Sequence, residues 1–360
     1  MIPLAPERPA AGERPPVLVV GGGAVGSFLG AVLAIGGRDV WLLDRPGMPV
    51  GPDQVRLRTP DDRLLAAPVT RIDDPAASPD PEFAVFAVRI TDLAAALPTV
   101  RRWPGLPVVT VENGLGAEEL AIDALTGHDV VAGSLVAPVA READGAFGWR
   151  KRRGLALAPA RGEGTPAIQG LRAAGATIGL PVAVSRDWRA MKWSKLLTNL
   201  VANATCAVLG VDPAAVYADR RLFAIERAQV HEALAAMRAH AVRLEALPGA
   251  DVPLLALAYR VPAPIGWPIL RRIVGSARGG KPPSLALHVR GAGGPSEAPW
   301  LNGGVARAAA QAHLSAPVNA TLAALVEAVA TQPALRARFA GNPTALIAQV
   351  QHAVITGRAP

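Results

Sequence analysis

The chain has 360 residues, of which 51% are hydrophobic and 18% are charged, and its formal net charge is +8 at pH 7. This length and composition can fill the cores of two domains, which excludes extended disorder over most of the chain. The basic run at residues 150–153 has no interleaved aromatic side chains, so the positive charge favours small anions over nucleic acid as partners.

The amino-terminal residues 1–15 lack the apolar segment of a signal peptide and are predicted to form a flexible tail. The longest apolar run after residue 250 is interrupted by Arg260 and several prolines, which makes it too short for a membrane span. The single cysteine, Cys206, cannot form an internal disulfide. We therefore expect a soluble, cytoplasmic protein with neither a membrane nor a nucleic-acid partner.

A glycine-rich turn follows the first apolar stretch. Residues 17–20 have strand character, residues 27–35 have helical character, and Gly21, Gly23 and Gly26 between them form G-x-G-x-x-G. Gly21 permits the tight turn, Gly23 lets the backbone approach a pyrophosphate, and Gly26 allows close packing. Ala24 and Val25 would open a helix whose N-terminus faces the anion. The pattern predicts dinucleotide binding.

The second predicted strand, residues 40–43, is followed by Asp44 and Arg45. Asp44 could hold the ribose hydroxyls of NAD, whereas Arg45 could pair with the additional phosphate of NADP. The sequence leaves the choice between these nucleotides open.

Further strands are predicted at residues 64–69, as a strand pair, and at 83–88 and 106–111. Arg89 and Asn113 follow two of them, at the carboxyl ends where a nicotinamide or a substrate would lie. The alternative for Asn113 is an ordinary Asn-Gly turn. Residues 128–158 predict short strands that add in antiparallel fashion to the edge of the sheet.

Residues 187–210 predict one long buried helix. Lys195, Asn199 and Asn203 stand at i, i+4 and i+8, and so share one face of that helix. A buried lysine and two buried amides need partners, which favours a ligand-facing row. A solvated face, or amides that only tie the helix to a loop, are the alternatives. Lys192 is interpreted as a surface lysine.

The remainder of the chain is predicted to be mostly helical, at residues 220–246, 305–313 and 320–330, around a functional loop at 278–299 that carries Ser284 and Glu297. The fold class is α/β, an N-terminal Rossmann-type doubly wound sheet with an all-helical C-terminal domain. The expected parts are a tail (1–15), an NAD(P)-binding domain (16–181), a helical substrate and catalytic domain (182–340) and a C-terminal segment (341–360). Neither a metal-ligand spacing nor a hydrolase motif is present.

From about residue 16 to 330 the sequence resembles the ketopantoate reductase (2-dehydropantoate 2-reductase) family. The resemblance is carried by VLVVGGGAVG (17–26), VENGLGAEE (111–119), KWSKLLTNLVANA (192–204), PSLALHVRGAGGPSEAPWLNGGV (283–305) and HLSAPVN (313–319). The third block and the order of the first four are more specific than the first block alone, which many dehydrogenases share, and the trailing HLSAPVN is similar to the closing motif of the family.

The resemblance implies an NADPH-dependent oxidoreductase that reduces 2-dehydropantoate to pantoate in pantothenate and coenzyme A biosynthesis, or a close 2-keto acid, in the cleft between the two domains. Lys195 would be the general acid for the ketone oxygen, and Glu297 would bind the substrate hydroxyl and influence the charge of the lysine. Asn199, Asn203 and Ser284 would bind the rest of the substrate, and Asn113 would bridge cofactor ribose and substrate. NAD is not excluded, because of Asp44.

Several positions depart from the family pattern. Arg89 stands where the family commonly has lysine, and Pro299 replaces an acidic residue. Leu285, Leu287 and His288 replace Met and Gln-Asp, and the glycine-rich run at 291–294 is one residue longer. These changes leave open a paralogue that reduces another 2-keto acid, and a non-catalytic NADP-sensing protein. A homodimer is also open.

Overall fold

The computed structural model describes residues 14–45, 53–277, 283–292 and 295–357. Most of the predicted tail (1–15), and residues 293–294 of the glycine-rich run 291–294, therefore lie outside the described residues. The chain forms two compact units. The sheet unit consists of Met1–Glu112, Gly116–Lys192 and Leu247–Ala250; the helical unit consists of Asn113–Leu115, Trp193–Ala246 and Asp251–Pro360. The main division follows Lys192, whereas the predicted boundary follows residue 181.

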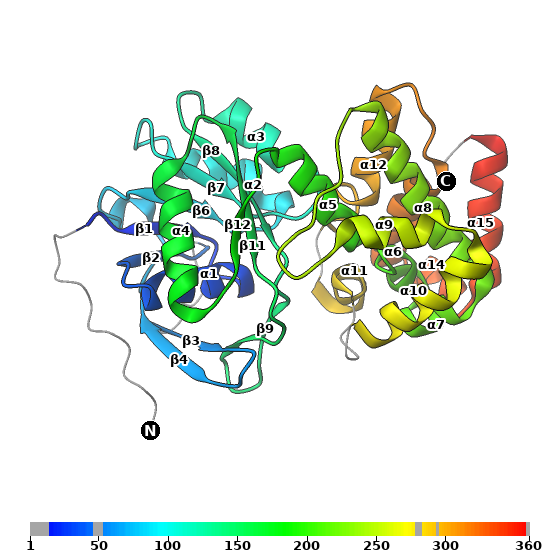
Figure 1. Cartoon of the computed structure of the whole chain (residues 1–360), viewed down its shortest axis with the longest axis horizontal. Helices are drawn as coiled ribbons and strands as arrows, with labels where there is room; N and C mark the ends of the chain where they lie inside the picture. Colours follow the sequence, from blue (N-terminus) through cyan, green and yellow to red (C-terminus); the bar gives the residue numbers. More distant parts are fainter. Residues whose placement is uncertain (1–13, 46–52, 278–282, 293–294, 358–360) are drawn as a thin grey trace. The chain divides into compact units, whose positions relative to one another are not determined.

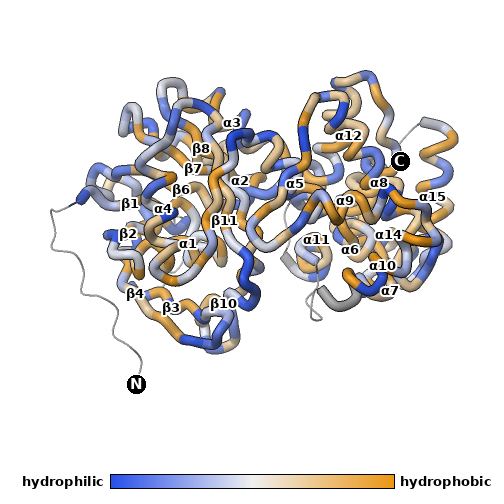
Figure 2. The backbone as a smooth tube through the Cα atoms, in the orientation of Figure 1, coloured by the Kyte–Doolittle hydropathy of each residue, from blue (hydrophilic) through white to orange (hydrophobic). Residues whose placement is uncertain are grey.

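The larger sheet of the sheet unit has eight strands in the described part of the chain (Figure 1). In spatial order they are β12 (Val182–Val184), β11 (Leu155–Arg161), β8 (Val130–Leu135), β7 (Val108–Thr110), β6 (Phe83–Phe86), β1 (Val17–Val20), β2 (Val40–Leu43) and β5 (Thr70–Ile72). Neighbours pair in parallel except β8 with β11. Every residue of β1 and β6 is buried, since helices cover both faces of a parallel sheet. Figure 2 shows the resulting hydrophobic character of these strands.

A smaller sheet orders β4 (Leu64–Pro68), β3 (Gln54–Arg58), β10 (Phe147–Trp149) and β9 (Val139–Arg141). Residues 64–69 were predicted to form a strand pair, but they contain only one strand of a pair, β4. Its antiparallel partner is β3, which precedes it in the chain. The prediction for residues 128–158 was correct only in part. Strand β11 does add in antiparallel fashion, but β8 is parallel to β7, and β9 and β10 join the smaller sheet.

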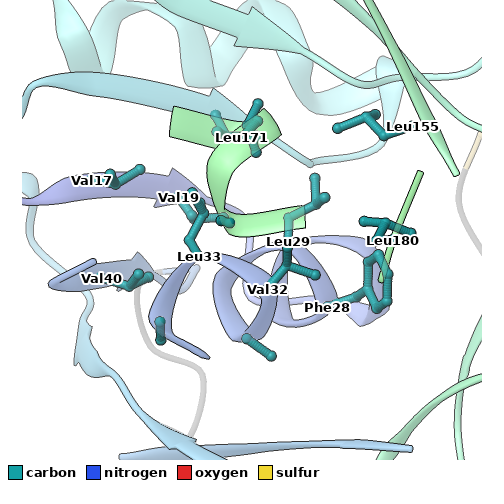
Figure 3. Packing of buried hydrophobic residues seen from close by; sticks show 14 of the residues in the cluster. Val17, Val19, Phe28, Leu29, Val32, Leu33, Val40, Leu155, Leu171 and Leu180 are labelled. Atoms are coloured by element: carbon teal, nitrogen blue, oxygen red, sulfur yellow. The ribbon is translucent and has the colours of Figure 1, made fainter. Parts of the chain in front are cut away.

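Helix α1 (Ala24–Ile35) contacts strands of both sheets and also α4 (Thr165–Ile178). Because it is covered on several sides, ten of its twelve residues are buried, and its sequence is apolar all round. In Figure 3, Leu33 of α1 lies beside Val19 of β1, and Phe28 of α1 lies beside Leu180. The core therefore fixes the start of α1 against the end of β1. Two further helices belong to this unit: α2 (Ile90–Ala96) and α3 (Ala117–Ala124).

The helical unit contains the remaining α-helices of the described residues. They are α5 (Trp188–Leu200, whose first turn belongs to the sheet unit), α6 (Ala204–Leu209), α7 (Pro213–Ala218), α8 (Arg220–Ala239), α9 (Val252–Arg260), α10 (Ala263–Ala277), α11 (Ser284–Leu287), α12 (Asn302–Gln311), α13 (Pro317–Thr331), α14 (Pro333–Phe339) and α15 (Pro343–Thr356). The predicted helix 220–246 ends early, because Ala241 adopts a left-handed φ of 54°. None of the helices in the described ranges has the length and hydropathy that crossing a membrane requires.

Candidate functional site

The glycine loop lies between the ends of β1 and β6, where the order of the parallel strands reverses. Gly21 has φ 107°, and a Cβ there would lie 2.9 Å from the carbonyl oxygen of Ala87. A Cβ at Gly26 would lie 1.8 Å from the carbonyl oxygen of Gly21. A Cβ at Gly23, by contrast, would meet nothing within 4 Å.

The first helical residues, Ala24 and Val25, follow Gly23, and the first turn of α1 contains no acidic residue. The first N–H groups of a helix have no partner within it, and they carry its positive end. Open space at Gly23 beside such a terminus fits a pyrophosphate at the position that ligands occupy in doubly wound sheets.

Asp44 directly follows β2, as the sequence predicts, but it already has a cationic partner. Nη1 of Arg71, in β5, lies 2.7 Å from Oδ2 of Asp44, and the two side chains are only 7% and 12% exposed. The other end of the guanidinium approaches Oγ of Ser27 in α1 at 3.4 Å. Sequence reasoning missed Arg71, because a strand of three residues gives no periodic signal that would pair it with β2.

Arg45 and Arg89 converge on one carboxylate in the sheet unit. Nη2 of Arg45 lies 2.9 Å from Oδ2 of Asp92, and Nε of Arg89 lies 3.1 Å from the same oxygen. Both arginines are exposed, with side-chain accessibilities of 66% and 42%. They are thus available to an anion at the surface, although each already shares Asp92.

The interpretation of Lys192 as a surface residue was wrong. Its side chain is 2% exposed, and its Nζ lies 2.9 Å from Oε1 of the fully buried Glu118. Nζ also donates to the carbonyl oxygen of Glu112 at 2.6 Å, and Thr110 donates its hydroxyl to the same carboxylate of Glu118. Lys192 is therefore a structural cation of the sheet unit. Burial also raises the pKa of the neighbouring Glu119.

The prediction of a single helix over residues 187–210 was also wrong. Helix α5 ends at Leu200, α6 begins at Ala204, and Ala202 between them has φ 52°. The buried carboxylate of Glu226, in α8, accepts the N–H of Ala202 at 2.7 Å and the hydroxyl of Thr205 at 2.6 Å. This carboxylate satisfies backbone that a continuous helix would have paired internally, and so it stabilises the break.

The break divides the predicted polar row. Lys195 and Asn199 remain one turn apart on α5, whereas Asn203 becomes the residue before α6 and leaves their helical register. Asn199 donates its amide to Oδ1 of Asn113 at 3.1 Å, which brings together two predicted residues that are far apart in the sequence. Lys195 is half-buried on the turn that precedes Asn199.

The Asn113 segment is also held by the turn that carries Glu297. The N–H of Leu115 donates to the carbonyl oxygen of Trp300 at 3.0 Å. Gly114 has φ 92°, and a Cβ there would lie 2.6 Å from that same oxygen, so the approach requires glycine. Glu297 itself accepts, through its carbonyl oxygen, the N–H of Trp300 at the entry to α12, and its side chain is half-buried.

Asn203 contacts Ser284, as part of the cap of α11. Its amide donates to the hydroxyl of Ser284 at 3.3 Å, and its Oδ1 accepts the N–H of Leu285 at 3.1 Å. Asn203 is 3% exposed, and Ser284 is exposed at the first position of the helix. The reading of Asn203 as a structural amide and the reading of Ser284 as a helix entry thus both have observations in their favour.

A cavity of about 300 Å³ in the helical unit contains none of the predicted site residues. It is lined by Phe223, Pro264 and Trp267, together with Arg220, Arg227 and His231 and neighbouring alanines. Arg227 and His231 both donate side-chain hydrogen bonds to the carbonyl oxygen of Tyr259. No cluster of three metal-ligating side chains occurs among the residues that the structure describes.

Two family models match the chain: ketopantoate reductase PanE/ApbA over residues 17–162, and its C-terminal counterpart over residues 187–330. A 2-dehydropantoate 2-reductase of Halobacterium salinarum is 28% identical over 204 residues, which are 56% of this chain and 67% of that protein. The crystal structure of a PanE/ApbA family ketopantoate reductase from Ralstonia eutropha JMP134 is similar with a TM-score of 0.71 and 25% identity, covering 87% of this chain and 98% of the other.

A likeness of fold alone extends to D-mandelate dehydrogenase in a ternary structure with NADH and anilino(oxo)acetate, with a TM-score of 0.68, 17% identity, and coverage of 89% of this chain and 99% of that one. The glycine loop beside the strand reversal, the Asn113–Asn199 pair and the two family matches agree with one another. The chain belongs to the ketopantoate reductase family and is an oxidoreductase.

Proposed function

We propose that this protein reduces 2-dehydropantoate to pantoate with NADPH, in the biosynthesis of pantothenate and coenzyme A. The observation that carries the proposal is the Asn113–Asn199 hydrogen bond one helical turn from Lys195. It joins the VENG segment to α5, and so gathers a cation and two amides within the helical unit. A 2-keto acid needs one cation at its carbonyl oxygen and neutral donors for its other oxygens.

When bound, NADPH supplies a hydride from C4 of its nicotinamide to the carbonyl carbon of the keto acid. Lys195 would hold the carbonyl oxygen and give it a proton, so that ketone, hydride and proton yield the alcohol. Asn199 would orient the acid, and Asn113 would bridge it to the ribose. Ser284 and Asn203 would bind the substrate carboxylate, and Glu297 would accept the substrate hydroxyl and tune the charge of Lys195.

The family is NAD(P)H-dependent, and NADPH is the finer part of the proposal. Three arginines support NADPH, because a guanidinium group can pair with its additional phosphate. Arg45 follows β2, Arg89 follows β6, and Arg71 lies in β5, beside β2. Asp44 is the observation in favour of NADH.

Another 2-keto acid is the second candidate substrate. Leu285 is buried and Leu287 is 46% exposed in the segment beside Ser284, which is more apolar than the family pattern. D-mandelate dehydrogenase has the same fold, so the fold does not select the acid. A non-catalytic NADP sensor is the less favoured candidate, because such a protein would not need Lys195, Asn199 and Glu297 together.

The test is NADPH oxidation by the purified protein with 2-dehydropantoate, beside other 2-keto acids and beside NADH. We expect turnover that Lys195→Met lowers by about 10²–10⁴-fold while NADPH binding persists, since the variant loses only the proton donor. Turnover of another acid alone would support the second candidate. Nucleotide binding without turnover of any acid would contradict both and leave the sensor.

A further inference from the structure

We propose that Arg71 is the residue that admits a 2′-phosphate to this nucleotide site, because it neutralises Asp44. The inference rests on the proposed function and deepens it, since it names what decides between NADPH and NADH. An acidic residue after the second strand of a doubly wound sheet ordinarily hydrogen-bonds the ribose hydroxyl of NAD, and its charge repels the phosphate of NADP. Asp44 occupies that position, directly after β2.

The contact between the two groups is close and largely shielded from water. Arg71 and Asp44 are only 7% and 12% exposed, and their atoms lie 2.7 Å apart. An ion pair with so little solvent around it is screened much less than a surface pair.

The glycine loop is shaped around this pair. A Cβ at Gly22 would lie 1.7 Å from Oδ1 of Asp44 and 2.9 Å from Nη1 of Arg71. Gly22 is not one of the three glycines of G-x-G-x-x-G, and it does not have a positive φ. A side chain at this position would therefore displace the ion pair, which lies directly against the backbone of the glycine loop.

The charges around the end of β2 then favour an anion. Among the described residues, the carboxylates of Asp44 and Asp92 contact three guanidinium groups, those of Arg71, Arg45 and Arg89. Without Arg71, two guanidinium groups would face two carboxylates, and Asp44, the carboxylate nearest the glycine loop, would lose its partner. A 2′-phosphate would then meet the negative charge of Asp44, whereas a ribose hydroxyl would still find an acceptor.

The experiment measures the dissociation constants of NADPH and NADH directly, by nucleotide fluorescence or calorimetry, with no keto acid present. We expect Arg71→Gln to shift the ratio of the two constants toward NADH by roughly tenfold or more, as loss of a charge at short range implies. Asp44→Asn should shift the ratio toward NADPH. The double variant should return it close to the wild-type ratio, because neither charge remains.

Arg63→Gln is the matched control, since it also removes one arginine paired to an aspartate, at an exposed position of the sheet unit. It should leave the ratio unchanged. Thermal unfolding of each variant separates loss of fold from loss of binding. If Arg71→Gln weakens both nucleotides equally, or shifts the ratio toward NADPH, the inference is overturned while NAD(P)H binding still stands. If the wild type binds neither nucleotide, the proposed function itself fails.

Discussion

At the scale of single residues, Gly23 and Gly26 of the glycine loop differ in what surrounds them. We predict that Gly26→Ala lowers the free energy of unfolding by about 3 kcal/mol, because its Cβ would clash with the rigid carbonyl of Gly21. Gly23→Ala should leave stability unchanged, since nothing lies within 4 Å, yet it should weaken NAD(P)H binding by roughly tenfold or more. Urea unfolding and nucleotide titration of both variants check this. Equal stability loss in the two would contradict it.

Two lysines three residues apart should separate stability from activity. Lys192→Met leaves the buried Glu118 without its cation, and we expect it to lower the free energy of unfolding by about 3–5 kcal/mol. Lys195→Met, at a half-buried position, should cost far less stability but lower turnover by about 10²–10⁴-fold. Denaturant unfolding and steady-state kinetics are the measurements. Restoration of stability in Lys192→Met/Glu118→Gln would show that the unpaired carboxylate caused the loss.

The sequence proposes the candidate residues, whereas most of their contacts come only from the structure. Gly21, Gly23 and Gly26 follow from a local pattern, so their geometry can be read from adjacent residues. The Arg71–Asp44 and Lys192–Glu118 pairs join segments distant in the chain, and each partner alone resembles an ordinary surface charge. Lys192 was misread for that reason. The roles of Lys195, Glu297, Asn113, Asn199, Asn203 and Ser284 stay predictions.

At the scale of elements, the break between α5 and α6 depends on a carboxylate from a third helix. Periodicity over residues 187–210 could not reveal it, because Ala202 is a good helix former and the cause is Glu226 in α8. Dependence on distant residues also explains why the sequence predicts strands β1 and β6 well but does not predict β3. Long apolar runs are local signals, whereas strand pairing in a small sheet is set by distant partners.

Glu226 should make stability depend on pH. Burial raises its pKa, against the hydrogen bonds from Thr205, Ala202 and Tyr217 that lower it, and the pKa of Tyr217 is itself raised, which keeps that neighbour neutral. The folded state therefore holds the proton of Glu226 more tightly than the unfolded state does. Stability from this group is present below the ordinary glutamate pKa and is lost as pH rises through the raised value.

The corresponding test compares the wild type with Glu226→Gln across that pH range. We expect the stability of the wild type relative to the variant to fall as pH rises, because only the wild type must bury a charge. Chemical denaturation at a series of pH values gives the difference. A difference that is constant, or that grows with pH, would mean that the hydrogen bonds outweigh burial at this site.

At the scale of the whole molecule, neither unit is a continuous stretch of chain. Residues 247–250 belong to the sheet unit, where the carbonyl oxygen of Pro248 accepts the N–H of Gly154, and residues 113–115 belong to the helical unit. We predict that a fragment of residues 1–192 binds NAD(P)H but unfolds at a lower temperature than the sheet unit of the full chain. Differential scanning calorimetry of both checks it. An unchanged unfolding temperature would show that residues 247–250 add no stability.

The exchange of segments between the units also bears on how relatives of this protein can recombine. A crossover after Lys192 would inherit Asn113 from one parent and Asn199 from the other, and would separate Gly154 from Pro248. Hybrid genes should therefore be viable only where both parents carry compatible residues at these pairs, or where the short segments are transplanted with the unit they belong to. A viable hybrid would thus inherit two short segments, residues 113–115 and 247–250, each together with the unit to which it belongs.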